Sequence, residues 1–330
     1  MAGEMSTVRA VVCPEYGSPG VLRVERRPVP APGEGEARVR VRAAAVNFPD
    51  VLLIAGRYQV TVPLPFVPGS EFAGVVTELG PDCAGFAIGD RVSGTGLYGA
   101  FAEEIVVPAA GLAPIPPGVD DRTAAAFGVA YRTAYHALRS AARVGPGDTV
   151  VVLGAGGGVG LAAVQLAGAL GIEVVAVASS SEKLSVAAFH GAQHLIDHRT
   201  ADVREALRAA VPQGATAVLD PVGGDLSEPA LRALGRGGRF VTIGYASGTV
   251  PRIPLNLVLV KGLHIVGFQF RDIAAGEFAR NERELAGLLA DGRVAPHIGA
   301  TFRLEDTAQA LERVAQGRAV GKVIIDLTCE

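Results

Sequence analysis

Five glycines lie within the seven residues from Gly154 to Gly160. The apolar run 150–153 precedes them, and an Ala- and Leu-rich run, 161–170, follows them. In such a loop the backbone N–H groups can approach a ligand closely, and the first turn of the following helix adds unpaired donors and a positive partial charge. A strand, a glycine loop and a helix in this order are typical of pyrophosphate binding in a dinucleotide site; the alternative is a tight turn without a ligand. The loop residues predicted to contact the cofactor are Gly154, Gly156, Gly157, Gly158, Val159 and Gly160.

The residues after the next predicted strand, 173–177, indicate which dinucleotide binds. NAD sites usually carry an acid there for the ribose hydroxyls, whereas this chain continues with serines and then a lysine. Hydroxyl groups and a cation suit a 2′-phosphate. We therefore predict NADPH as the cofactor, with Ser179, Ser180 and Lys183 at its phosphate. In the alternative, Ser181 caps the next helix and Lys183 is a solvated surface charge.

The elements around this loop change character along the chain. Residues 1–125 predict many short strands between Gly and Pro turns, as in a small barrel. An alanine-rich helix over 124–142 leads into a strand–helix alternation, with strands at 149–153, 173–177, 194–196, 217–219, 239–243 and 263–266. Six strands joined by helical crossovers predict a doubly wound parallel sheet. Helices at 277–290 and 305–315 and a strand at 322–327 follow, and we expect this tail to return to the first domain.

Composition sets the broad class. A chain of 330 residues suggests two domains, and 49% hydrophobic residues provide a large core. The net charge is −3 and no basic run occurs, so nucleic acid and anionic membranes are poor partners. The three dispersed cysteines indicate no disulfide framework and fit a reducing compartment. With no signal-peptide pattern and no apolar run of membrane-spanning length, we expect a cytoplasmic location.

Several segments together resemble the medium-chain dehydrogenase/reductase superfamily, and among its branches the zinc-independent, zeta-crystallin-like quinone oxidoreductases. These are AVNFPDVLLIAGRY (45–58), LPFVPGSEFAGVV (64–76), AIGDRV (87–92), TAYHAL (133–138), the glycine loop, DPVGGD (220–225), GRGGRFVTIG (235–244), IPLNLVLVKGL (253–263) and GKVII (321–325). The resemblance implies an α/β fold: a Rossmann doubly wound parallel sheet inserted into a GroES-like β-barrel catalytic domain. We expect the catalytic domain over 1–126 and 268–330, and the Rossmann NADPH-binding domain over 127–267.

The resemblance also bears on metal. Zinc alcohol dehydrogenases of the superfamily carry a cysteine and a histidine where this chain has Asn47 and Ser70, and they carry a cysteine cluster that this chain lacks. Zinc needs several converging ligands, so we expect no metal. Alcohol oxidation then loses its Lewis acid. Quinones and α,β-unsaturated carbonyl compounds remain as possible substrates, because they accept hydride at an electron-poor centre and require only a proton or hydrogen-bond donor.

The resemblance implies three catalytic residues. Tyr58 would protonate the product enolate, since a phenol remains protonated at neutral pH. Asn47 would hydrogen-bond near the nicotinamide ribose or the substrate oxygen, and the Thr133 hydroxyl would meet the cofactor. The alternatives are that Asn47 only caps the helix beginning at Pro49 and that Tyr58 only fills a loop. Leu52 stands where a second tyrosine is common, which makes the pocket more apolar.

Further site residues follow from the resemblance. His198, where the branch usually has tyrosine, and its neighbour Arg199 are candidates for phosphate contact. Lys322 is either a cofactor ligand or a surface charge, and Arg132 replaces a usual small residue without an evident reason. The remaining predicted cofactor residues are Gly244, Asn256 and Phe268, and the predicted substrate pocket comprises Phe48, Leu52, Tyr58, Phe268 and Phe270.

Two alternative functions remain open at this stage. One is a non-catalytic NADPH-binding protein, such as a crystallin or a redox sensor, and the other is an enoyl-thioester reductase. The family tendency also implies a homodimer formed through the edge strand 263–266, which is apolar.

Overall fold

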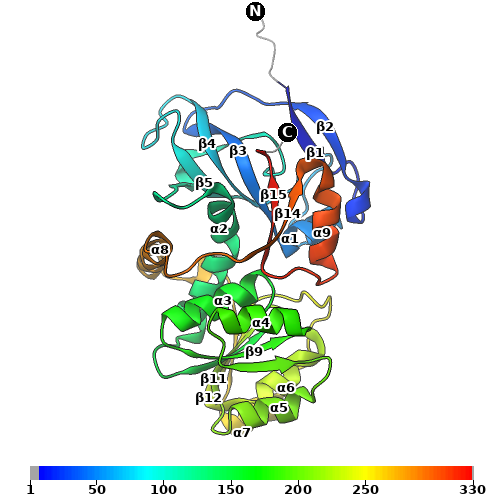
Figure 1. Cartoon of the computed structure of the whole chain (residues 1–330), viewed down its shortest axis with the longest axis vertical. Helices are drawn as coiled ribbons and strands as arrows, with labels where there is room; N and C mark the ends of the chain where they lie inside the picture. The colour runs from blue at the N-terminus through cyan, green and yellow to red at the C-terminus, as the bar shows by residue number, and fades with distance from the viewer. Residues whose placement is uncertain (1–6, 329–330) are drawn as a thin grey trace, which may run out of the picture. The chain divides into compact units, whose positions relative to one another are not determined.

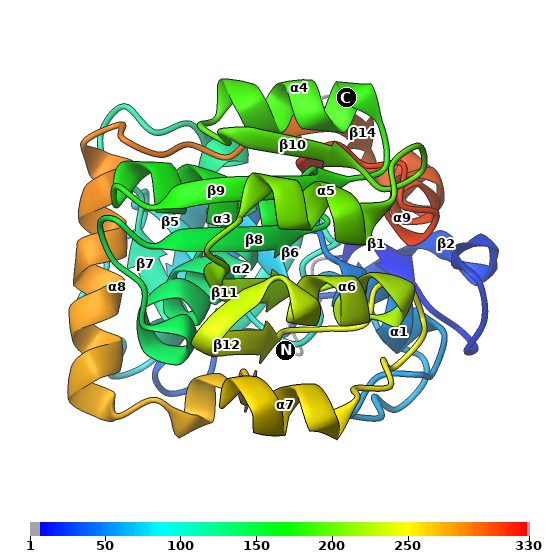
Figure 2. The same cartoon turned by 90° about the horizontal axis from the view of Figure 1, so that it is seen from below.

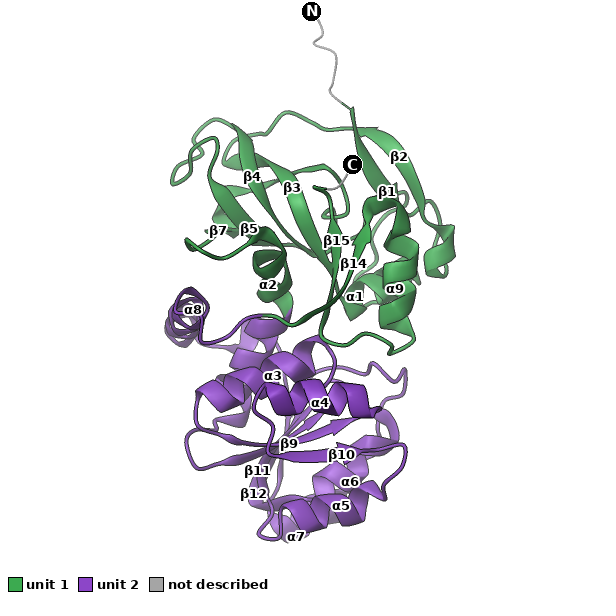
Figure 3. Ribbon diagram, viewed as in Figure 1, with its two compact units in different colours: residues 1–129, 296–330 green, residues 130–295 purple. Residues whose placement is uncertain are grey.

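The computed structural model describes residues 7–328, and the chain forms two compact units (Figure 3). Unit 1 is Met1–Val129 with Pro296–Glu330, and unit 2 is Ala130–Ala295. The first boundary lies close to the predicted one. The second does not, since residues 268–295 belong to unit 2. The reason is that helix α8 (Ala275–Ala290) is tied to the end of α2 (Asp121–His136), where His136 Nε2 lies 2.9 Å from Glu282 Oε1.

Unit 1 is a β structure closed by the C-terminal strand of the chain. Its main sheet has the order β14-β15-β3-β4-β5-β7, with β6 paired to β3, and β1 and β2 form a separate antiparallel pair. The C-terminal β15 pairs antiparallel with β3, so the predicted return to the first domain holds for the chain from Pro296 onward but not for the predicted helix 277–290, which lies in unit 2. The strands are β1 Thr7–Val12, β2 Arg23–Pro28, β3 Glu36–Val46, β4 Glu71–Leu79, β5 Arg91–Thr95, β6 Glu104–Pro108, β7 Leu112–Pro114, β14 Ile298–Arg303 and β15 Lys322–Asp326. Helices α1 (Phe48–Ile54) and α9 (Thr307–Ala315) also belong to this unit, as do residues 121–129 of α2.

Alternation of apolar and charged residues along β3 shows why this sequence forms a sheet with one solvent-exposed face. Val39 and Val41 are buried in the unit 1 core, whereas Arg40 and Arg42 between and after them are exposed. A side-chain period of two sends successive residues to opposite faces of a strand. Arg40 and Arg42 therefore lie on the solvent-exposed face of the strand.

Unit 2 is a doubly wound sheet whose six strands are all parallel. Their order is β10-β9-β8-β11-β12-β13, and Figure 2 shows β10, β9, β8, β11 and β12 in this sequence. In Figure 1, α3 and α4 cover one face of the sheet and α5, α6 and α7 cover the other. The strands are β8 Thr149–Leu153, β9 Glu173–Ala178, β10 His194–Asp197, β11 Ala215–Asp220, β12 Leu234–Thr242 and β13 His264–Gly267. The crossover helices are α3 Gly158–Ala169, α4 Ser181–Phe189, α5 Val203–Ala210, α6 Ser227–Arg232 and α7 Leu255–Lys261.

Burial explains the continuous apolar strands of unit 2. The side chains of Val150, Val151, Val152 and Leu153 have no exposed surface, because helices cover both faces of the central strand β8. In such sheets ligands bind beyond the carboxyl ends of the strands, where the strand order reverses.

Among residues 7–328, no helix combines the length and the apolar composition that a membrane span requires.

Candidate functional site

The glycine loop joins β8 to α3, as predicted. Gly154 has a φ of +64°, in the left-handed region that favours glycine, and Gly157 is the N-cap of α3. A Cβ on Gly160 would lie 2.2 Å from the carbonyl oxygen of Gly154, so the first turn of α3 packs against the loop more closely than a side chain permits. The free N–H groups of this first turn therefore face the carboxyl edge of the sheet, where a pyrophosphate would need them.

Lys183 links the glycine loop to the end of β9. Its Nζ donates to Ser179 Oγ at 3.1 Å, and a Cβ on Gly156 would lie only 2.5 Å from the Cβ of Lys183. Burial lowers the pKa of Lys183, and the nearby Arg199 charge lowers it further. Lys183 is thus half-buried against the loop, and the alternative of a fully solvated surface charge is wrong.

The cap of α4 is Ser180, and not Ser181 as the sequence suggested. Ser180 Oγ accepts from the backbone N–H of Lys183 at 3.3 Å. Ser180 has the extended backbone of an N-cap, whereas Ser181 is already the first helical residue. The Ser180 hydroxyl is therefore partly used by the helix, which leaves Ser179 and Lys183 as the better phosphate donors.

His198 directly follows β10 and is half-buried. Burial lowers the pKa of its imidazole; the Asp197 carboxylate opposes this effect, and the charges of Arg199 and Lys183 add to it. The imidazole is therefore mainly neutral at pH 7. Ser179, Lys183, His198 and Arg199 thus gather at the carboxyl ends of β9 and β10, where the sequence placed the 2′-phosphate.

The other predicted cofactor residues of unit 2 follow the neighbouring strands. Gly244 comes after β12, and its N–H donates to the Asp220 carbonyl at 3.3 Å. Phe268 comes after β13, and its N–H donates to the Thr242 carbonyl at 3.2 Å. Asn256 is exposed in the first turn of α7. All three lie beyond the carboxyl ends of parallel strands, on the same edge as the glycine loop.

Asn47 belongs to a buried polar cluster in unit 1. Lys322 Nζ donates to Asn47 Oδ1 at 2.6 Å and to Glu71 Oε1 at 2.5 Å. Asn47 Nδ2 in turn donates to Glu71 Oε1 at 2.9 Å and to Ser70 Oγ at 3.1 Å. Asn47, Ser70, Glu71 and Lys322 are all at most 7% exposed. The interpretation of Lys322 as a surface charge is therefore wrong, because two of the three ammonium donors bind Asn47 and Glu71.

The beginning of α1 explains how Asn47 serves two purposes. Its backbone N–H donates to Asp50 Oδ2 at 2.7 Å, which is one half of a capping box, while its side chain reaches Lys322 and Glu71. Asp50 is fully buried, and burial raises its pKa to about 7 against the lowering effects of the Asn47 N–H and the Lys322 ammonium. Asn47 therefore begins the helix and also belongs to the polar cluster.

Tyr58, Phe48 and Leu52 come from α1 and the turn after it. All three are half-buried, and Tyr58 packs against the hydrophobic core of unit 1. Thr133, also half-buried, lies on α2 in unit 2. The structure thus brings the predicted residues into two groups, one in each unit.

Arg132 has a structural role that the sequence did not reveal. Its Nε lies 2.8 Å from Glu282 Oε2 on α8, and its guanidinium lies over the rings of Phe270 and Phe278. Phe270, a predicted pocket residue, is therefore held by a cation that belongs to the same helix as Thr133.

The residues near Asn47 do not fit zinc. Within residues 7–328, no three His, Cys, Asp or Glu side chains gather closely enough to hold a metal ion. Asn47 and Ser70 hydrogen-bond to each other, the Lys322 ammonium lies against the Glu71 carboxylate, and the Asp50 carboxylate accepts from the Asn47 N–H. This donor set lacks the thiolate and imidazole ligands that zinc prefers.

Sequence reasoning missed two buried acids, Asp50 and Asp220. Asp220 Oδ1 accepts from the N–H groups of Val222 and Gly223, and its Oδ2 accepts from Ser227, so it shapes the turn after β11. The spacing of Asp50, three residues after Asn47, was a usable capping-box signal.

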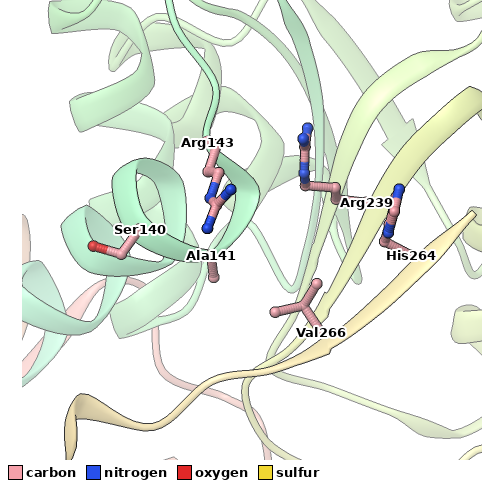
Figure 4. A pocket seen from close by; sticks show the side chains of 6 residues that line it. All are labelled: Ser140, Ala141, Arg143, Arg239, His264 and Val266. Atoms are coloured by element: carbon pink, nitrogen blue, oxygen red, sulfur yellow. The ribbon is translucent and has the colours of Figure 1, made fainter. Parts of the chain in front are cut away.

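One pocket of unit 2 contains none of the predicted site residues (Figure 4). It has a volume of about 260 Å³ and lies beside His264, the first residue of β13, at the edge of the sheet opposite the glycine loop. Its lining residues are Ser140, Ala141, Arg143, Arg239, His264 and Val266.

Comparison with known proteins now identifies the family. Residues 33–117 match the alcohol dehydrogenase GroES-like domain, and residues 158–287 match the zinc-binding dehydrogenase family. Quinone oxidoreductase-like protein 2 from Bos taurus is 38% identical, with 97% of this chain and 92% of the relative covered. Human quinone oxidoreductase is 31% identical, with 98% and 99% covered. A segment of polyketide synthase GfsB from Streptomyces halstedii is 36% identical over 281 residues, 85% of this chain and 5% of the synthase.

Solved structures agree with the sequence matches. Escherichia coli quinone oxidoreductase complexed with NADPH has a TM-score of 0.89 at 26% identity and covers 97% of this chain and 100% of its own. Mycobacterial Rv1454c complexed with NADPH has a TM-score of 0.89 at 31% identity, with the same coverage. These matches confirm the predicted fold, a GroES-like domain with an inserted Rossmann domain. The chain belongs to the medium-chain dehydrogenase/reductase superfamily, in its quinone oxidoreductase branch, and is an NAD(P)-dependent oxidoreductase.

Proposed function

We propose that this protein is a zinc-independent, NADPH-dependent reductase that transfers hydride to quinones or α,β-unsaturated carbonyl compounds. The observation that carries the cofactor choice is Lys183, packed on the glycine loop and bonded to Ser179 where NAD sites usually carry an acid. A cation and a hydroxyl favour the 2′-phosphate of NADPH, whereas an acid there would repel it. The NADPH complexes of two structural neighbours support the same choice.

Each unit has its own task in this proposal. In unit 2, the first-turn N–H groups of α3 bind the pyrophosphate, and Lys183 and Ser179 bind the 2′-phosphate. In unit 1, the Asn47 side chain, held by Lys322 and Glu71, orients the nicotinamide ribose or the acceptor oxygen. NADPH, when bound, supplies the hydride.

Tyr58 supplies the proton that an enone requires. Hydride reaches the β-carbon of the acceptor, the α-carbon takes the phenolic proton, and water then reprotonates the tyrosinate. The side chain is half-buried, and within residues 7–328 its hydroxyl makes no hydrogen bond that would compete with a substrate. A quinone ends instead with protons on oxygen, so its reduction depends less on Tyr58.

Zinc independence is also part of the proposal, although one matching family is described as zinc-binding. Asn47 and Ser70 offer an amide and a hydroxyl in place of a thiolate and an imidazole, and Lys322 neutralises Glu71. Equal activity before and after treatment with a chelator is expected. Activity that disappears with the chelator and returns with zinc would overturn this part.

An enoyl thioester is a second acceptor class, and the match to a polyketide synthase favours it. An acceptor panel that includes quinones, 2-alkenals, enones and enoyl thioesters, monitored by NADPH absorbance, separates the two classes. Tight NADPH binding without turnover of any acceptor would instead indicate a non-catalytic NADPH-binding protein.

We also propose a cytoplasmic homodimer. On α7 and β13, Leu255, Leu259, Val260 and Ile265 are between 42% and 83% exposed, and β13 is an edge strand. An exposed apolar edge invites pairing with a second copy. Light scattering is expected to give a dimer for the natural chain and a monomer for Leu259→Glu, and a monomeric natural chain would contradict the proposal.

A further inference from the structure

Arg132 and His136 lie one turn apart on α2 and bind the same acid on α8. Arg132 Nε is 2.8 Å from Glu282 Oε2, and His136 Nε2 is 2.9 Å from Glu282 Oε1. His136 has no exposed surface. The amide nitrogen Nδ2 of Asn281 lies 3.3 Å from His136 Nδ1. An amide N–H can only donate, so His136 Nδ1 accepts, and His136 Nε2 donates to Glu282.

The charge of Glu282 is stabilised by this arrangement. Burial alone would raise the pKa of its carboxyl, but the His136 hydrogen bond and the Arg132 guanidinium hold the pKa below its usual range. Glu282 therefore forms a fixed ion pair with Arg132 and a hydrogen bond with His136, and these contacts join α8 to α2 in unit 2.

Three phenylalanine rings, those of Phe278, Phe270 and Phe268, pack next to Arg132 and His136 or next to one another. His136 stacks on Phe278 at 4.8 Å with an interplanar angle of 14°, and it meets Phe270 edge-on at 5.6 Å. The Arg132 guanidinium carbon lies 5.8 Å from the centroid of Phe270 and 5.5 Å from that of Phe278. Phe270 in turn packs edge-on against Phe268 at 5.0 Å. A chain of contacts thus runs from Glu282 through Arg132 and His136 to Phe268.

The position of these rings gives the contacts a functional meaning. Phe268 and Phe270 follow β13 at the carboxyl edge of the sheet, the edge at which ligands bind in doubly wound folds. Phe270 is 39% exposed, although large apolar rings are usually buried. Phe270 thus contacts Arg132, His136 and Phe268 and still keeps exposed surface that a planar ligand can contact.

We propose that Arg132 and His136 are positioning residues that hold Phe270, and through it Phe268, as a fixed aromatic wall selecting planar acceptors. This inference rests on the proposed function, since it assumes an acceptor bound at this edge. A ring fixed in advance stacks on a quinone with little loss of conformational freedom. A small acyclic enal covers less of the ring and depends less on its position.

Kinetics test the selective part of the proposal. Arg132→Met removes the guanidinium and is expected to raise the KM for a naphthoquinone about fivefold to tenfold, the range expected for a partly desolvated cation–π and ion-pair contact. The kcat and the Kd for NADPH are expected to change by less than about twofold, as is the KM for an acyclic enal. Arg232→Met is the matched control, because Arg232 pairs with Glu228 on α6, away from these rings.

Fluorescence tests the positioning part without any substrate. The chain contains no tryptophan, so Phe270→Trp introduces a single reporter. We expect high anisotropy and restricted quenching by acrylamide for this reporter, and a clear loss of both when Arg132→Met is added, but not when Arg232→Met is added.

The outcomes separate the two hypotheses. Equal mobility of the reporter with and without Arg132 would overturn the positioning role, whatever the activity. A mobile reporter with equal increases in KM for quinone and enal would overturn the selective role. If no acceptor is turned over, the proposed function fails, while the fluorescence result still decides whether Arg132 fixes the wall.

Discussion

Replacement of Asp50 by Asn tests the buried polar cluster of unit 1 through the pH dependence of folding. Asp50 is fully buried, and burial raises its pKa from an ordinary 3.8 to about 7. The folded chain therefore holds a proton that the unfolded chain releases. The contribution of protonated Asp50 to the free energy of unfolding is complete below the pKa of Asp50 in the unfolded chain. It is lost as the pH rises toward the pKa of Asp50 in the folded chain.

The magnitude follows from the size of the shift. A change of about 3 pKa units at 1.36 kcal/mol each corresponds to about 4 kcal/mol, of which about 2–3 kcal/mol is lost between pH 5 and pH 8. Asp50→Asn removes the titrating proton, while its amide oxygen can still accept from the Asn47 N–H. The variant is therefore expected to gain about 2–3 kcal/mol relative to the natural chain from pH 5 to pH 8.

Urea unfolding at a series of pH values measures this difference. The matched control is Asp90→Asn, because Asp90 also accepts from a backbone N–H three residues earlier, that of Ala87, but is exposed. Its profile is expected to run parallel to that of the natural chain. Parallel profiles for Asp50→Asn as well would refute the reasoning, since Asp50 would then be ionised in both states.

Three further predictions concern the choice of cofactor, the proton donor Tyr58 and the buried polar cluster around Asn47. Lys183→Ala should raise the Kd for NADPH at least tenfold and that for NADH less than about twofold, since a charged hydrogen bond to phosphate contributes about 1.5–3 kcal/mol; equal losses in titrations with the two nucleotides would argue against a 2′-phosphate contact. Tyr58→Phe should lower the kcat for an enal by a factor of about 100 or more and that for a quinone far less; equal effects in steady-state assays would exclude Tyr58 as the proton donor. Lys322→Met should destabilise the fold by about 3–5 kcal/mol in urea unfolding, because it leaves Glu71 buried without its cation. Adding Glu71→Gln should recover a large part of this loss, and a double variant as unstable as the single one would show that charge is not the cause.

Much of unit 2 was predictable because local patterns decide it. Strand β8 and the beginning of α3 fall where the apolar run and the glycines indicate, and the six strands have the expected parallel arrangement. Such strands read as continuous apolar runs because helices cover both faces. The glycine loop was equally predictable, since close backbone approach at Gly160 excludes side chains.

Long-range contacts set the features that the sequence did not reveal. Residues 268–295 stay with unit 2 because Glu282 binds Arg132 and His136, and their separation in the chain gives no periodic signal. Lys322 resembles a surface lysine in sequence, but β15 brings it to Glu71 and Asn47. Ser180 caps α4 rather than its neighbour Ser181, since one residue of helix register decides which hydroxyl faces the free N–H groups.

The oxidation of NADPH by a panel of acceptors, with chelator-treated protein and with NADH in parallel, tests the central claim most directly. We predict turnover of quinones or α,β-unsaturated carbonyl compounds with NADPH, much weaker turnover with NADH, and none of simple ketones. Zinc should add nothing. Reduction of simple ketones that requires added zinc, or equal use of both nucleotides, would contradict the account.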